Sequence, residues 1–173
     1  PLAAVADTGI DVIVIDHHLA GPDLPRAHSV INPNRLDEDG AYGHLCAAGV
    51  TFIVLVALLR ELRSRGAFTE SSPAPDLMRQ LDLVGLATVC DVVPLTGVNR
   101  AFVGQGLKVL GQRTNLGLAC LADQAGLNTP PSGHTFGFLL GPRINAGGRI
   151  GSSDLGVRPV SYTHLTLPTK PFV

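Results

Sequence analysis

The sequence predicts an α/β fold in which part of a parallel sheet is packed by helices. An apolar run rich in β-branched residues lies near the start, and several segments with helical periodicity follow it. The 173 residues are 45% hydrophobic and 16% charged, which suffices to bury a core and excludes a disordered or collagen-like chain. The formal net charge of −1 gives no overall sign of a nucleic-acid partner, although a local basic site is compatible with it.

Two strands are expected in the first part of the chain. A short helical segment covers residues 2–8 and ends at Gly9. Residues 10–15 then form a run that is apolar at nearly every position, which is typical of a strand buried on both faces of a parallel sheet. A second strand is expected over residues 29–31, and the sequence Asn-Pro-Asn-Arg at 32–35 forms a turn after it.

Helices are expected over most of the remaining chain. The longest pattern covers residues 46–65, is basic in its last turn, and ends at Gly66. Its apolar part, residues 45–59, is shorter than the roughly 20 residues of a membrane span, so we expect a buried helix and no membrane partner. Further helices are expected over residues 77–89, 99–110 and 116–125.

The first candidate for chemistry is the triplet Asp16, His17 and His18, which stands where the first strand ends. Open α/β sheets bind ligands at the carboxyl ends of their strands. Imidazole binds divalent metals, and a neighbouring carboxylate can orient the ring or complete a cation site. The triplet therefore indicates a metal site, and the alternative is a solvated polar strand end.

The second candidate is Asp91, which stands among Val89, Val92 and Val93. Burying a carboxylate in such surroundings is costly unless it is paired or bound to a cation. We therefore expect a metal as the partner of Asp91. The alternative is an aspartate that caps a helix after a chain reversal.

The third candidate is the segment 141–149, with the sequence Gly-Pro-Arg-Ile-Asn-Ala-Gly-Gly-Arg. Glycines let the backbone approach a ligand closely, and the guanidinium groups of Arg143 and Arg149 can bind a phosphate bidentately. We expect a phosphate-binding loop here. The alternative is a Gly-rich turn with arginines that cap a helix.

Three segments stand in an order that resembles the DHH phosphoesterase superfamily. They are Val-Ile-Val-Ile-Asp-His-His at 12–18, Leu-Val-Gly-Leu-Ala-Thr-Val-Cys-Asp-Val-Val-Pro-Leu at 83–95, and the segment 141–149. Within the superfamily they are similar to the exonucleases that are specific for single-stranded DNA. The turn at 32–35 and the helix entry at 45–50 are also similar, so that the resemblance covers about residues 2–158.

The resemblance implies a two-metal site that holds Mn²⁺ or Mg²⁺ and hydrolyses single-stranded DNA from the 5′ end towards the 3′ end, in DNA repair and recombination. In that superfamily the first His of the triplet and the Asp directly before Val-Val-Pro-Leu bind metal, which assigns His17 and Asp91 as ligands. Asp16 would orient the site, and His18 would lie close to the scissile phosphate.

The resemblance also implies a nucleic-acid contact surface and partners. Arg143, Asn145 and Arg149 would contact the DNA. The implied partners are single-stranded DNA, a single-strand-binding protein and a helicase, and the implied location is the cytoplasm. Two alternatives stay open, namely a phosphoesterase for short oligonucleotides, cyclic dinucleotides or pyrophosphate, and a non-catalytic replication scaffold.

The same resemblance divides the chain into three parts. Residues 1–97 would be the C-terminal part of a DHH domain, and residues 98–158 a helical connector that leads to a further domain. Residues 159–173 do not resemble the family and look like translated adapter sequence. Further metal-binding aspartates of the superfamily would lie upstream of Pro1, so we expect the chain alone to have no nuclease activity.

Overall fold

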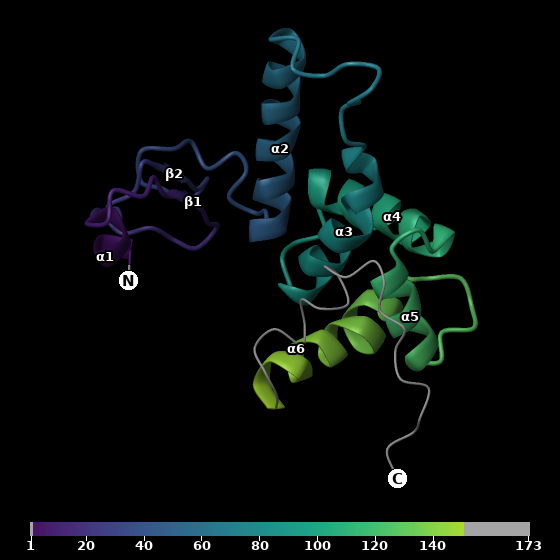
Figure 1. Cartoon of the computed structure of the whole chain (residues 1–173). Coiled ribbons are helices and arrows are strands. Elements are labelled where there is room, and N and C mark those ends of the chain that lie inside the picture. The colour runs from purple at the N-terminus through teal and green to yellow at the C-terminus, as the bar shows by residue number, and fades with distance from the viewer. Residues whose placement is uncertain (1, 151–173) are drawn as a thin grey trace. The chain divides into compact units, whose positions relative to one another are not determined.

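The computed structural model describes the backbone of residues 2–150 and the side chains of residues 2–146 (Figure 1). The predicted tail at 159–173 therefore lies outside the described residues. The elements, in chain order, are α1 (Leu2–Ala6), β1 (Ile13–Ile15), β2 (Ser29–Ile31), α2 (Ala47–Ser64), the 3₁₀-helix η1 (Leu77–Gln80), α3 (Leu81–Cys90), α4 (Gly97–Gln112), α5 (Leu116–Gln124), the π-helix η2 (Thr135–Leu140) and α6 (Gly141–Ile150). The predicted α/β class is confirmed.

The described residues form two compact units. The first, here called the strand unit, contains the chain up to Leu77 and also Val93–Asn99. The second, here called the helical unit, contains Met78–Val92 and the described residues from Arg100 onward. Met78–Val92 thus belongs to the same unit as the later helices. The domain boundary predicted at residue 97 stays a prediction.

The sheet of the strand unit consists of β1 and β2, which pair in parallel with Ile13 opposite Ser29 and Ile15 opposite Ile31. The prediction that the first strand is buried on both faces was wrong, because Ile13 is 62% exposed. Burial on both faces requires a packed layer on each side of the sheet. Helix α2 packs against β1, but the two described strands have no such double cover.

Helix α2 begins and ends where the sequence predicts. Cys46 is its N-cap residue, Arg65 its C-cap residue, and Gly66 follows with a φ of +67°. A glycine adopts this left-handed conformation without the steric cost of a side chain, which is why it commonly ends a helix. Among the described residues, no helix is long and apolar enough to cross a membrane.

Asn99 joins the returning segment Val93–Asn99 to the rest of the strand unit. Its side chain is 0% exposed, and its Nδ2 donates hydrogen bonds to the carbonyl oxygens of His44 at 2.7 Å and Pro94 at 2.9 Å. A buried side-chain amide without such partners would cost free energy. The strand unit therefore depends on a residue that lies beyond Met78–Val92 in the chain.

The helical unit has its own apolar core. Helix α3 packs against η2 and α6, and α5 packs against η2. The buried side chains of this core come from α3, α4, α5 and η2: Leu86, Val103, Leu110, Leu118, Ala122, Phe136 and Leu140. Close approach of α3 and α4 depends on glycine, because a methyl group on Gly106 would overlap the carbonyl oxygen of Leu81 and lie 3.2 Å from Cα of Gly85.

A buried carboxylate lies in the first turn of α3. Asp82 is 1% exposed, its Oδ1 accepts the backbone N–H of Leu83 at 2.8 Å, and its Oδ2 has no hydrogen-bond partner among the described residues. Burial raises the pKa of Asp82 above its ordinary value of 3.8. The folded state therefore holds this proton more tightly than the unfolded state does.

The substitution Asp82→Asn should change how stability depends on pH. Because the pKa of Asp82 is raised on folding, ionisation destabilises the folded chain as the pH rises from about 4 to the folded-state pKa. Asparagine does not ionise, so the variant should gain stability relative to wild type by at most about 1.4 kcal/mol per pH unit in that window, and by a constant amount above it. Urea unfolding of both proteins between pH 4 and 8 measures the difference. A difference that does not change with pH would contradict this assignment.

Candidate metal and nucleic-acid site

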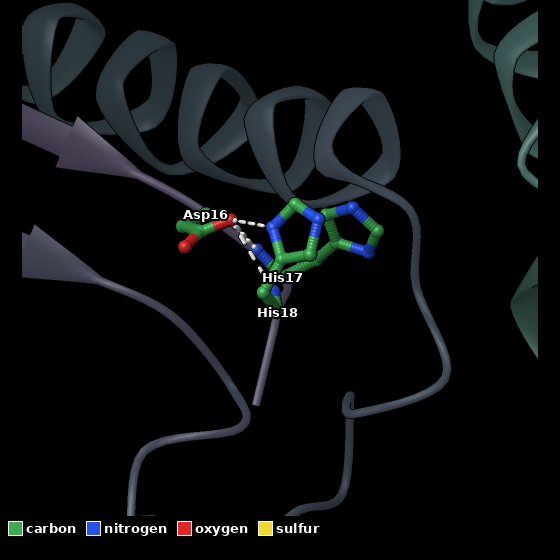
Figure 2. A group of neighbouring side chains, drawn as sticks. All are labelled: Asp16, His17 and His18. Atoms are coloured by element: carbon green, nitrogen blue, oxygen red, sulfur yellow. Dashed lines mark hydrogen bonds and ion pairs between the residues drawn. The ribbon is translucent and has the colours of Figure 1, made fainter. Parts of the chain in front are cut away.

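The triplet Asp16, His17 and His18 directly follows β1 (Figure 2). The backbone N–H of Asp16 donates to the carbonyl oxygen of Ile31 at 3.0 Å, which extends the pairing with β2 by one residue. The triplet thus lies at the carboxyl end of a parallel strand, where the sequence predicts it. This is the edge at which open α/β sheets bind ligands.

The carboxylate of Asp16 organises the two residues that follow it. Its Oδ1 accepts the backbone N–H of His17 at 2.7 Å and that of His18 at 3.2 Å, and lies 2.7 Å from Nδ1 of His18 (Figure 2). The hydrogen bond with the ring of His18 is the main cause that lowers the pKa of Asp16. Partial burial raises this pKa, and the two backbone N–H groups lower it further. Asp16 is therefore an anion near neutral pH, and its geometry suits the predicted orienting role.

The two imidazoles lie side by side. Their ring centroids are 4.4 Å apart and the rings are tilted by 47°. One ligand atom from each residue of the triplet lies within 4.8 Å of the others, so the group could hold a metal ion. Imidazole nitrogen with carboxylate oxygen is a donor set that suits a divalent transition metal. The side chain of His18 is 78% exposed, which leaves it accessible to a substrate.

The turn after β2 also reaches the triplet, a contact that sequence reasoning missed. Nδ2 of Asn34 donates to the carbonyl oxygen of His17 at 2.7 Å, and Nδ2 of Asn32 donates to that of His18 at 2.8 Å. The sequence predicts a turn here, and the resemblance extends to it, but neither assigned the two asparagines a role in the site. The signal was available, because the carboxyl ends of neighbouring parallel strands lie at the same edge of a sheet.

Asp91 lies in the helical unit, at the C-cap position of α3. Its backbone N–H donates to the carbonyl oxygen of Ala87 at 2.9 Å. The expectation of a carboxylate buried among valines was wrong, because Asp91 is exposed and Val92 is 87% exposed with a φ of +57°. The helix ends here and the chain turns away, so the alternative of an aspartate at a helix end describes its local structure. Its role as a metal ligand stays a prediction.

The segment Gly141–Ile150 is the helix α6, so the predicted Gly-rich loop was wrong. Pro142 is the second residue of α6, which follows η2 without a break, and it has no N–H to donate to the preceding turn. Gly141 allows close packing, because a methyl group there would lie 2.8 Å from the carbonyl oxygen of Phe136. The loop in which glycines were expected to let the backbone approach a phosphate is thus a helix over Gly141–Ile150.

The predicted DNA-contacting residues are distributed along α6. The Nη1 of Arg143 donates to the carbonyl oxygen of Leu139 at 2.7 Å, and both Arg143 and Asn145 are exposed. Side chains two residues apart on a helix do not face each other, so Arg143 and Asn145 do not form one contact patch. Arg149 belongs to α6, but its side chain lies outside the described residues.

Comparison with known proteins gives consistent matches. Residues 1–86 match the N-terminal domain of the DHH family. The chain is 41% identical over 152 residues to the single-stranded-DNA-specific exonuclease RecJ of Escherichia coli K12, a match that covers 86% of this chain and 26% of that protein. The RecJ of Bacillus subtilis 168 is 36% identical over 152 residues, which cover 87% of this chain and 18% of that protein.

Solved structures match as well. The structure is similar to the crystal structure of RecJ in complex with Mn²⁺ from Thermus thermophilus, with a TM-score of 0.77 and 32% sequence identity. That match covers 94% of this chain and 23% of that one. A second match is the crystal structure of exonuclease RecJ bound to manganese, with a TM-score of 0.74, 32% identity, and coverage of 92% of this chain and 37% of that one. The chain spans about a quarter of the length of the Escherichia coli protein that it matches.

Proposed function

We infer the function of this chain from its membership in the DHH family, to which residues 1–86 belong. We propose that the protein that carries it is a metal-dependent exonuclease that hydrolyses single-stranded DNA from the 5′ end towards the 3′ end, in DNA repair and recombination. The observation that supports this most is the triplet at the carboxyl end of β1, whose ligand atoms lie within 4.8 Å of one another. Similarity to RecJ over most of the chain supports the choice of substrate.

The residues of the chain fit a divalent cation. Oδ1 of Asp16 already accepts hydrogen bonds from two backbone N–H groups and contacts the ring of His18, which favours Asp16 as the orienting group and His17 as a ligand. We propose that His17 and Asp91 hold Mn²⁺ or Mg²⁺ in a two-metal site. Such ions supply positive charge that stabilises the attacking and leaving oxygens of a phosphodiester and make water more acidic.

The remaining assignments concern the substrate. His18 is exposed beside the proposed ligand His17, so its imidazole can contact a phosphate oxygen or transfer a proton at the scissile bond. Arg143, Asn145 and Arg149 would contact the DNA backbone as separate points along α6. A single-strand-binding protein and a helicase complete the proposed set of partners, and the cytoplasm is the proposed location.

The full-length protein that contains this segment is the material for the test. With Mn²⁺ present, it should release nucleotides from a long single strand labelled at its 5′ end, and it should not digest a duplex of the same sequence. Removal of metal with EDTA should abolish the reaction, because no side chain of the triplet can replace the cation charge. Preferred cleavage of dinucleotides would instead support a small-substrate phosphoesterase. Absence of Mn²⁺ binding would support a scaffold.

A further inference from the structure

We propose that Asn32 and Asn34 are positioning residues of the DHH metal site. Their side-chain amides hold the carbonyl groups of His18 and His17, and thereby set where the two imidazoles stand. We call the pair the asparagine clamp. The proposal rests on the proposed function, since it assigns these residues to the same metal site.

The backbone of His17 and His18 is held by side chains and not by the sheet. Strand β1 ends at Ile15, and the last hydrogen bond to the neighbouring strand is the one from the N–H of Asp16 to Ile31. The N–H groups of His17 and His18 then donate to Asp16, and the carbonyl groups of the same two residues accept from the asparagine clamp. Each histidine is therefore fixed on both sides of its own Cα atom.

The asparagine clamp is itself held in place. Asn32 is buried, and its Oδ1 accepts the backbone N–H of Asn34 at 2.9 Å. Nδ2 of Asn34 makes a second hydrogen bond, to the carbonyl oxygen of Gly43 at 3.0 Å, and the carbonyl oxygen of Asn34 accepts from the N–H of Ala20 at 3.2 Å. Ala20 lies two residues after His18. The clamp therefore binds this segment through its side chains, at His17 and His18, and through its backbone, at Ala20.

Gly43 leaves the space that the carboxamide of Asn34 occupies. A methyl group on Gly43 would overlap Oδ1 of Asn34 and lie 3.4 Å from its Cγ. The backbone of Gly43 is thus both the second acceptor of Asn34 and one wall of its site. Packing on one side and hydrogen bonds on the other restrict the side chain to one position, as a positioning group requires.

The chemistry requires an amide at these positions. Both clamp bonds run from an N–H donor to a carbonyl oxygen. An ionised aspartate has nearly the same shape but has no donor, so it would set a negative oxygen against the carbonyl of a histidine. The substitution Asn34→Asp therefore releases His17 with little change in side-chain volume, and Asn32→Asp does the same for His18.

The test compares Asn34→Asp with Asn115→Asp in the full-length protein. Asn115 caps α5 by accepting the N–H of Leu118 through Oδ1, a role that aspartate fills equally well. Mn²⁺ binding is measured from the electron paramagnetic resonance signal of free Mn²⁺, together with urea unfolding, kcat and KM. We expect Asn34→Asp to weaken Mn²⁺ binding by about 10- to 100-fold, the usual effect of losing a group that orients metal ligands, and to leave KM for DNA nearly unchanged. Asn115→Asp should match wild type.

The outcomes separate this proposal from the proposed function. Weaker Mn²⁺ binding in Asn34→Asp supports the asparagine clamp even if the wild-type protein does not digest DNA. Unchanged Mn²⁺ binding and an unchanged kcat in a folded Asn34→Asp variant would overturn the clamp, even if the wild-type protein is an active exonuclease. If Asn34→Asp does not fold, Asn32→Asp provides the same comparison at His18, with the same two outcomes.

Discussion

Replacement of His17 by alanine in the full-length protein should reduce Mn²⁺-dependent hydrolysis of single-stranded DNA by roughly 10²- to 10³-fold. Losses of this size are typical when one group that stabilises charge in the transition state is removed. The backbone carbonyl of His17 remains bound by Asn34 in the variant, and its N–H remains bound by Asp16, so the local fold should persist. Initial rates over a series of Mn²⁺ concentrations measure the effect.

A matched control is His134→Ala. His134 is exposed in the helical unit and stacks on Phe138, with ring centroids 5.0 Å apart and no assigned role in the site. This variant should keep wild-type rates. Comparable losses in both variants would show that the first result reflects damage to the protein as a whole.

His18→Ala distinguishes the two roles that we assign within the triplet. Its side chain is exposed and contacts Asp16, whereas His17 is the proposed ligand. Loss of His18 should therefore lower kcat and affect Mn²⁺ binding less than loss of His17 does. Stronger loss of Mn²⁺ binding in His18→Ala than in His17→Ala would reverse the assignment.

The substitution Gly106→Ala should destabilise the helical unit by about 2 kcal/mol. A methyl group at this position overlaps the carbonyl oxygen of Leu81, a backbone atom that cannot rotate away. Overpacking of this kind costs about 1–3 kcal/mol, more than the gain of up to about 1 kcal/mol that alanine brings to a helix interior. Urea unfolding followed by circular dichroism gives the free energy of unfolding.

Gly104→Ala, two residues earlier in α4, tests whether the effect comes from packing. A methyl group on Gly104 would have no atom within 4 Å outside its own helix, so only the helical preference of alanine should act. This variant should be more stable than wild type by up to about 1 kcal/mol. Equal destabilisation in both variants would contradict the close approach of α3 and α4.

Local sequence signals predicted the elements well. The run at 10–15 contains β1, and the helical pattern at 46–65 differs from α2 by one residue at each end. These features depend on residues close together in the chain, namely an apolar run, a basic last turn and a terminal glycine. The predictions that failed depended on how each segment packs against other parts of the chain. Double burial of β1 needs layers that the described strands lack, and Asp91 is exposed because α3 ends at Cys90.

The same distinction explains what was and was not predicted in the site. The triplet could be predicted because its three residues are adjacent and stand at a strand end. The asparagine clamp acts over fourteen and seventeen positions, and its geometry depends on the register of β1 and β2. Asp82 stands in an ordinary helical pattern, and its burial follows from how α3 packs. The glycines of α6 misled because the segment continues the helical path of η2.

The strand unit is built from two separate stretches of the chain, which affects how it can fold during protein synthesis. Asn99, whose buried amide donates hydrogen bonds to the carbonyls of His44 and Pro94, is made only after Met78–Val92. A nascent chain that has reached Leu77 already contains the DHH triplet but cannot yet complete the unit around it. Since chains fold in part while they are made, the packing around Asn99 forms only after the ribosome has also delivered Met78–Val92, whereas the residues that hold the triplet are all made before Leu77. The strand unit thus completes its packing only after part of the helical unit has been synthesised.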